Sequence, residues 1–99
     1  MKTKTFNSLE ELKKYYNEET NTYIFREGEN WFNVDIQFNL KIESNIKACD
    51  INAYDINAWD IVFWAICIAT KTLICKSITG ARNNAKYLCL DNEPVIKGV

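Results

Sequence analysis

From Ile46 to Asp60 the chain reads IKACD INAYD INAWD, three copies of the five-residue unit I-x-A-x-D. Two looser copies, IVFWA and ICIAT, continue the pattern to Thr70. A period of five residues matches neither the 3.6-residue period of an α-helix nor the two-residue period of a flat strand. We therefore interpret each unit as a very short strand with Ile and Ala pointing inward and a corner at Asp, so that successive units form successive sides of a solenoid.

After a two-residue slip, the same inward spacing resumes at Leu73 and Cys75 and again at Ile78 and Gly80. The coil region is therefore expected over residues 45–80, which makes about two turns if four units complete one turn. An antiparallel meander with evenly spaced strands remains the alternative. A solenoid this short cannot bury its own ends and needs caps.

The flanking residues supply candidates for both caps. Ser8-Leu9-Glu10-Glu11 has the form of a capping box and predicts a helix over residues 9–17, with Leu9, Leu12 and Tyr16 on one face. A strand over 22–25, a hairpin turn over 27–30 and strict apolar alternation over 34–42 follow. The prediction is one domain over 1–99, mainly β: a helix-plus-hairpin cap over 1–44, a short right-handed β-helix over 45–80, and a C-terminal hairpin cap over 81–99.

Composition limits the function. The 99 residues carry 12 Lys and Arg against 13 Asp and Glu, a net charge of −1, so direct binding to nucleic acid is not expected. The sequence contains no histidine, the usual general base and zinc ligand. The longest apolar run, 61–69, is too short for a membrane-spanning helix, and the polar N-terminus shows no signal peptide. We expect a soluble cytoplasmic protein without a membrane partner.

Four cysteines, at positions 49, 67, 75 and 89, are separated by 18, 8 and 14 residues. No C-x-x-C pair is present, and three of the four lie among apolar residues, so free thiols are expected, with one disulfide or a metal site as alternatives. No cofactor or metal is predicted. Asp50, Asp55 and Asp60 fall at successive corners, where each is expected to bond its own backbone in an Asx-turn; mimicry of phosphate groups is the alternative.

The fourth position of the unit is expected to point outward and is occupied by Cys49, Tyr54, Trp59 and Trp64. Exposed large aromatic side chains are typical of binding hot spots. The predicted binding surface consists of these rings and their polar neighbours: Tyr54, Trp59, Trp64, Asp55, Asp60 and Asn57. The alternative is a second small core in which Trp31 and Phe32 cover the rings.

The motif order INAYDINAWD, FWAICIA, CKSI-x-G-x-R-x-N-x-K and YLCLDNE resembles small pentapeptide-repeat-like proteins of low-GC Gram-positive bacteria and their phages. This resemblance covers residues 42–96 and implies a β-helical fold. It brings no catalytic residues. Because small phage proteins often act by occupying a host factor, the resemblance also implies an anti-CRISPR-like inhibitor as one expectation, by analogy alone.

The usual catalytic motifs are missing from the sequence, including a Ser/His or Cys/His pair, a phosphate-binding loop and H-E-x-x-H. We therefore expect a protein that is not an enzyme. The first function hypothesis is a binding module for another protein, with a host effector that targets nucleic acid as one candidate partner. The second is a structural protein that associates with itself through its open coil ends, with a homodimer as one form.

Overall fold

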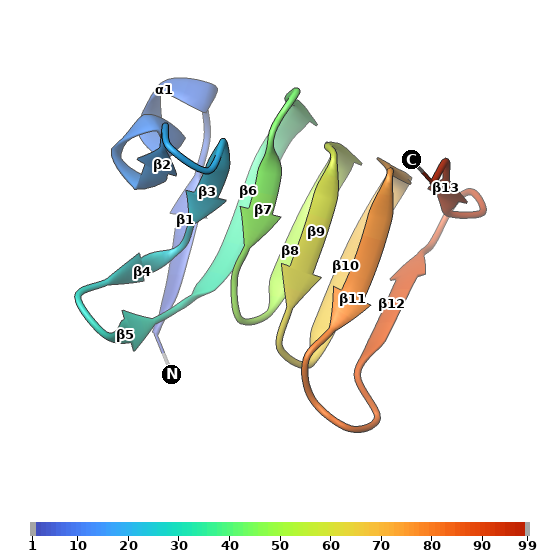
Figure 1. Cartoon of the computed structure of the whole chain (residues 1–99). Coiled ribbons are helices and arrows are strands. Elements are labelled where there is room, and N and C mark those ends of the chain that lie inside the picture. The colour runs from blue at the N-terminus through green and yellow to red at the C-terminus, as the bar shows by residue number, and fades with distance from the viewer. Residues whose placement is uncertain (1, 99) are drawn as a thin grey trace.

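The computed structural model describes residues 2–98, and Figure 1 shows their strands stacked side by side as the coils of a solenoid. The chain is mainly β, as predicted. The elements in chain order are β1 (Thr3–Phe6), α1 (Leu9–Leu12), a 3₁₀ turn (Lys13–Tyr15), β2 (Tyr16–Asn17), β3 (Thr22–Ile24), β4 (Arg26–Glu27), β5 (Asn30–Trp31), β6 (Asn33–Lys41), β7 (Asn45–Lys47), β8 (Ile51–Asn57), β9 (Asp60–Phe63), β10 (Ile66–Cys75), β11 (Ser77–Gly80), β12 (Lys86–Cys89) and β13 (Val95–Ile96).

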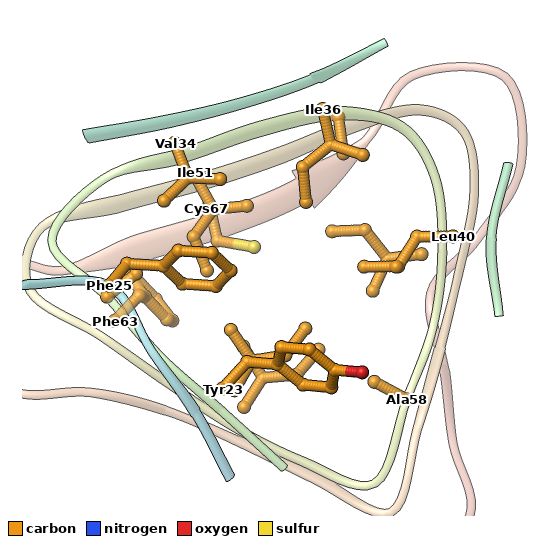
Figure 2. Close-up of a cluster of buried hydrophobic side chains, with 14 of the residues drawn as sticks. Tyr23, Phe25, Val34, Ile36, Leu40, Ile51, Ala58, Phe63 and Cys67 are labelled. Carbon is orange, nitrogen blue, oxygen red and sulfur yellow. The ribbon is translucent and has the colours of Figure 1, made fainter. Parts of the chain in front are cut away.

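Each coil has three sides, which gives the rounded triangular cross-section in Figure 2. The long strands β6, β8 and β10 bend at a register shift, so each forms two sides, and β3, β7, β9 and β11 form the third. Parallel pairing joins each residue to one about a coil away, as Val34 to Ile51 and Ile51 to Cys67. The prediction of four units to a turn is wrong, because three short sides already close around a lumen filled by one layer of side chains.

The repeat places its side chains as predicted in the three strict copies. Ile46, Ile51 and Ile56 are all at most 1% exposed, and the Ala two positions after each is also buried. The prediction fails at the last looser copy, where Ile66 is 45% exposed and Cys67 takes the inward position. The two-residue slip therefore begins at Ile66. Inward packing then continues through Leu73 and Cys75, as expected.

The N-terminal segment differs from the predicted helix over 9–17. Helix α1 ends at Leu12 and tightens into the 3₁₀ turn, which brings Leu12 and Tyr15 inward and leaves Leu9 and Tyr16 exposed. Tyr15 packs edge-on against Phe6 and Phe32, with ring centroids 5.7 and 5.1 Å apart. The apolar face of the segment is therefore set by this aromatic cluster rather than by regular helical spacing.

The hairpin predicted around residues 27–30 is confirmed as the antiparallel pair β4 and β5, with Gly28 at a φ of +61° in the turn. Two other expectations at the ends of the coil region are wrong. Strand β6 is not part of a cap, because it pairs in parallel with β8 and so belongs to the coils. Strands β12 and β13 do not form a closing hairpin; each pairs in parallel with β10 and adds to the stack.

Candidate functional site

The predicted aromatic surface is divided among different corners of the triangle. Tyr54 lies at the bend within β8, Trp59 between β8 and β9, and Trp64 directly after β9. Because one coil has three sides, positions five residues apart fall on successive corners and point in different directions. The six residues predicted as one binding surface are therefore not brought together.

Two of the rings instead have a cation from the next coil beside them. The Lys76 ammonium group lies 3.9 Å from the centroid of the half-buried Trp59 ring, and Lys71 lies 5.9 Å from that of Tyr54. The backbone of Trp59 also bonds to both neighbouring coils. Its N–H donates to the carbonyl of Ser44, and its carbonyl accepts a hydrogen bond from the N–H of Lys76. Such cation–π contacts stabilise the stacking of adjacent coils.

The predicted acidic residues also connect coils. The carboxylate of Asp55 accepts a hydrogen bond from the Thr72 hydroxyl at 2.8 Å, and that of Asp60 accepts one from the Ser77 hydroxyl at 2.7 Å. Both partners lie 17 residues further along the chain, so the expected Asx-turns within each corner are replaced by bonds to the following coil. Asn57 is half-buried, and its backbone carbonyl accepts a hydrogen bond from the N–H of Ile42. These three residues have structural partners.

Trp64 is different, because it lines a lateral groove of about 710 Å³ and is 50% exposed. The groove runs between the β4–β5 hairpin and the third side of the coils. Its lining residues are Glu29, Asn30, Trp31, Lys47, Ala48, Cys49, Val62, Phe63, Trp64 and Ala81. Most of these side chains are apolar. Of the two charged ones, Glu29 lies in the β4–β5 turn and Lys47 in β7. The groove can accept an apolar side chain or a short extended segment of a partner.

The second indole of the groove, Trp31, was considered in the sequence only as a cover for other rings. It lies at the end of β5, where the Arg26 guanidinium is 5.4 Å and the Lys47 ammonium 5.7 Å from its ring centroid. Arg26 is the cross-strand neighbour of Trp31 within the hairpin, whereas Lys47 belongs to β7 and so connects the ring to the coil. The sequence feature that could have indicated a role for Trp31 is the hairpin turn directly before it. The coil residues that face Trp31 could not be identified from the sequence, because that requires the three-sided cross-section.

Cys49 was predicted to point outward, but it is buried and is one of the residues that line the groove. Burial raises the pKa of its thiol, and the neighbouring Asp50 carboxylate raises it further. Since the thiolate is the nucleophile, this cysteine is poorly reactive at neutral pH. Burial also raises the pKa of Cys67, to about 12, and that of Cys75. All four cysteines are free thiols.

Over residues 2–98, no cluster of three or more His, Cys, Asp or Glu side chains is placed to hold a metal ion. In the same part of the chain, no helix has the length and apolar character needed to cross a membrane. The candidate site is the groove lined by Trp31 and Trp64.

The fold and the groove define a mainly β protein built as a parallel β-solenoid with an aromatic-lined lateral groove. Comparisons with protein-family models, with curated proteins and with solved structures found no match to this chain.

Proposed function

We propose that this chain is a non-catalytic protein-binding module and that the lateral groove is its binding site. One observation carries the proposal: two indole rings, Trp31 and Trp64, line one largely apolar groove on the side of the coils. Tryptophan is the residue most enriched at binding hot spots, because it buries a large area with little loss of side-chain entropy. The hydrogen-bonded coil beneath the groove is preorganised, which limits the ordering cost of binding.

The groove favours a partner segment that inserts an aliphatic or aromatic side chain between the hairpin and the coil. Glu29 and Lys47 at its lining supply one charge of each sign, so the partner's flanking charges set orientation more than affinity. Of the six residues expected from the sequence, only Trp64 belongs to this proposed site. Tyr54 and Trp59 serve as controls, because they are aromatic residues at other corners of the same coils.

A display library of peptides selected on the immobilised chain tests this site. The selected peptide is titrated by calorimetry into the unmodified chain and into Trp64→Ala, Trp31→Ala and Tyr54→Ala. We expect both groove variants to lose about 2 kcal/mol of binding free energy, roughly 30-fold in affinity, and Tyr54→Ala to bind like the unmodified chain. If the selected peptides bind both groove variants with the affinity of the unmodified chain, the interface lies elsewhere.

We propose a host effector that targets nucleic acid as the natural partner, in the cytoplasm of a Gram-positive host. The support for this class of partner is the resemblance to small phage repeat proteins, together with an acidic chain unsuited to binding nucleic acid itself. A purified RNA-guided nuclease from such a host provides the assay. Inhibition of DNA cleavage that Trp64→Ala abolishes and Tyr54→Ala retains would support the proposal; cleavage unaffected by the chain would refute it for that effector.

We also propose that the coil winds in the right-handed sense and that α1 with the 3₁₀ turn is its N-terminal cap. Right-handed crossovers between parallel strands are strongly preferred because of strand twist, which supports the winding sense. The burial of Leu12 and Tyr15 against the aromatic cluster supports the cap. A structural protein that associates with itself is the second candidate function, favoured by the exposed apolar side chains at the opposite end of the stack.

A further inference from the structure

The β4–β5 hairpin forms one wall of the groove, yet its backbone is bonded to the coils only at its base. Within residues 2–98, β4 and β5 pair with each other alone, and no backbone hydrogen bond connects residues 26–31 to a coil. Figure 1 shows the hairpin projecting beyond the stacked strands. A two-stranded hairpin is at best marginally stable by itself in water. The hairpin beyond its base is therefore held in place by side-chain contacts.

The base of the hairpin is fixed in the core. Phe25 and Phe32 are 1% and 3% exposed, and their ring centroids lie 6.1 Å apart. The N–H of Phe25 donates to the carbonyl of Lys47 at 3.0 Å, and the N–H of Phe32 donates to the carbonyl of Phe25 at 3.3 Å. Between these anchors, residues 26–30 are exposed and Trp31 is half-buried. The hairpin can therefore shift about Phe25 and Phe32 without disturbing the core.

A lysine from β1 contacts the hairpin from the inner side. Lys4 and Phe6 alternate with two exposed threonines, so Lys4 lies on the inward face of β1. Its side chain is 27% exposed, and its ammonium group forms an ion pair with the carboxylate of Glu27 in β4. The same ammonium group lies 4.8 Å from the centroid of the Phe32 ring. An ion pair that is partly shielded from water is stronger than one on an open surface.

The hydroxyl of Tyr15 joins this contact. Tyr15 is 8% exposed; its hydroxyl accepts a hydrogen bond from Lys4 Nζ at 3.2 Å and donates one to Glu27 Oε1 at 3.4 Å. A hydroxyl on a buried ring needs such partners. Glu27 is thus bonded to two elements of the N-terminal end, β1 and the 3₁₀ turn. Lys4, Tyr15 and Glu27 are not among the residues that line the groove.

We infer that the ion pair between Lys4 and Glu27 fixes the position of the hairpin wall and thereby raises the affinity of the groove for its ligand. Trp31 lies in the strand paired with that of Glu27, so a shift of Glu27 moves Trp31 as well. While the pair holds, the wall is preorganised; once it is broken, binding must also order the hairpin, which weakens affinity. Lys4 and Glu27 are positioning residues, and their effect on affinity rests on the proposed function.

Amide hydrogen exchange of the full chain, followed by NMR without ligand, tests the position of the wall. Lys4→Met removes the ammonium group and keeps an apolar stem, and Glu27→Gln removes the charge and keeps the size of the side chain. In each variant we expect the amides of residues 26–31 to exchange roughly fivefold faster, while those of β8 keep their rates. The double variant should match either single one, because both changes break the same pair.

Lys13→Met is the matched control. Lys13 Nζ lies 2.7 Å from the Glu10 carboxylate in an ion pair of the same N-terminal end, and both side chains are exposed. This variant should leave the exchange of the hairpin unchanged. Hairpin exchange that is unchanged in Lys4→Met, equally fast in Lys13→Met, or accelerated together with that of β8 would overturn the inference.

Affinity provides the second measurement. A selected peptide whose binding depends on Trp64 should bind Lys4→Met roughly fivefold more weakly and Lys13→Met as tightly as the unmodified chain. It should also slow the hairpin exchange of the unmodified chain, because binding and ordering are reciprocal. Equal affinity for Lys4→Met would overturn the link between hairpin and groove. If peptide binding does not depend on Trp64 at all, the proposed function fails, whereas the exchange rates without ligand still decide whether the ion pair holds the wall.

Discussion

The Asp50 carboxylate accepts a hydrogen bond from the backbone N–H of Ile66 at 3.1 Å, across 16 residues of sequence. The backbone N–H of Asp50 donates in turn to the side chain of Asn33 at 3.2 Å, so three successive coils are connected at one corner. The corners of this solenoid are thus held by side chains that satisfy the backbone of the adjacent coil. That role explains why Asn and Asp recur in a chain with only three Gly and one Pro.

Replacing Asp50 should test this corner contact. Asp50→Ala leaves the N–H of Ile66 without its partner, and we expect a loss of about 1–2 kcal/mol in the free energy of unfolding. Asp50→Asn keeps an oxygen acceptor at the same place and should lose less. Urea denaturation followed by circular dichroism measures both. Equal losses in the two variants would mean that the charge, and not the acceptor, matters at this corner.

The lumen should not tolerate a larger side chain at Ala53. This residue is 2% exposed and lies between Ile36 and Ala69 of the adjacent strands. Ala53→Leu adds methylene groups to a filled space, so we expect a loss of about 1–3 kcal/mol. Asn52→Leu, one residue earlier and exposed, is the control and should be nearly neutral. A stable Ala53→Leu protein would contradict the inward position of alanine.

Leu12→Ala should destabilise the N-terminal end. Leu12 is fully buried beneath the 3₁₀ turn, and removing its side chain should cost about 2–5 kcal/mol through lost burial and a residual cavity. Leu9→Ala, three residues earlier in α1, removes an exposed side chain and should have little effect. Thermal unfolding distinguishes the two variants. If both were neutral, the proposed cap would not support the coil.

Stability should fall at alkaline pH because of the buried thiols. Burial raises the pKa of Cys67 from 9.0 to about 12, so the unfolded chain releases this proton at lower pH than the folded chain does. The stabilising contribution is complete below about pH 9 and is lost as the pH rises towards 12. Urea unfolding between pH 8 and about 10.5 should show the decline, and Cys67→Ala should make it shallower. An identical slope in the variant would exclude Cys67 as a cause.

The inward positions of the strict repeat could be predicted from the sequence, because the spacing of Ile and Ala is a local pattern that directly reflects burial. The hairpin around Gly28 was predictable for the same reason, since its turn chemistry lies within four residues. The end of the helix expected over 9–17 could not be predicted in this way. Tyr15 packs inward against Phe6 and Phe32, and these contacts do not appear in the local spacing of apolar residues.

The candidate site required the three-dimensional arrangement. A repeat of five residues specifies that the chain turns at each corner, but not the angle, and the difference between three and four sides decides where every outward side chain points. Three sides separate Tyr54 from Trp64 and bring Trp64 into one groove with Trp31. The residues that pair across coils lie 15 to 17 positions apart in the central layers, so their contacts arise only when the stack closes. Local spacing thus set which side chains are buried, while closure of the coil set which exposed ones meet.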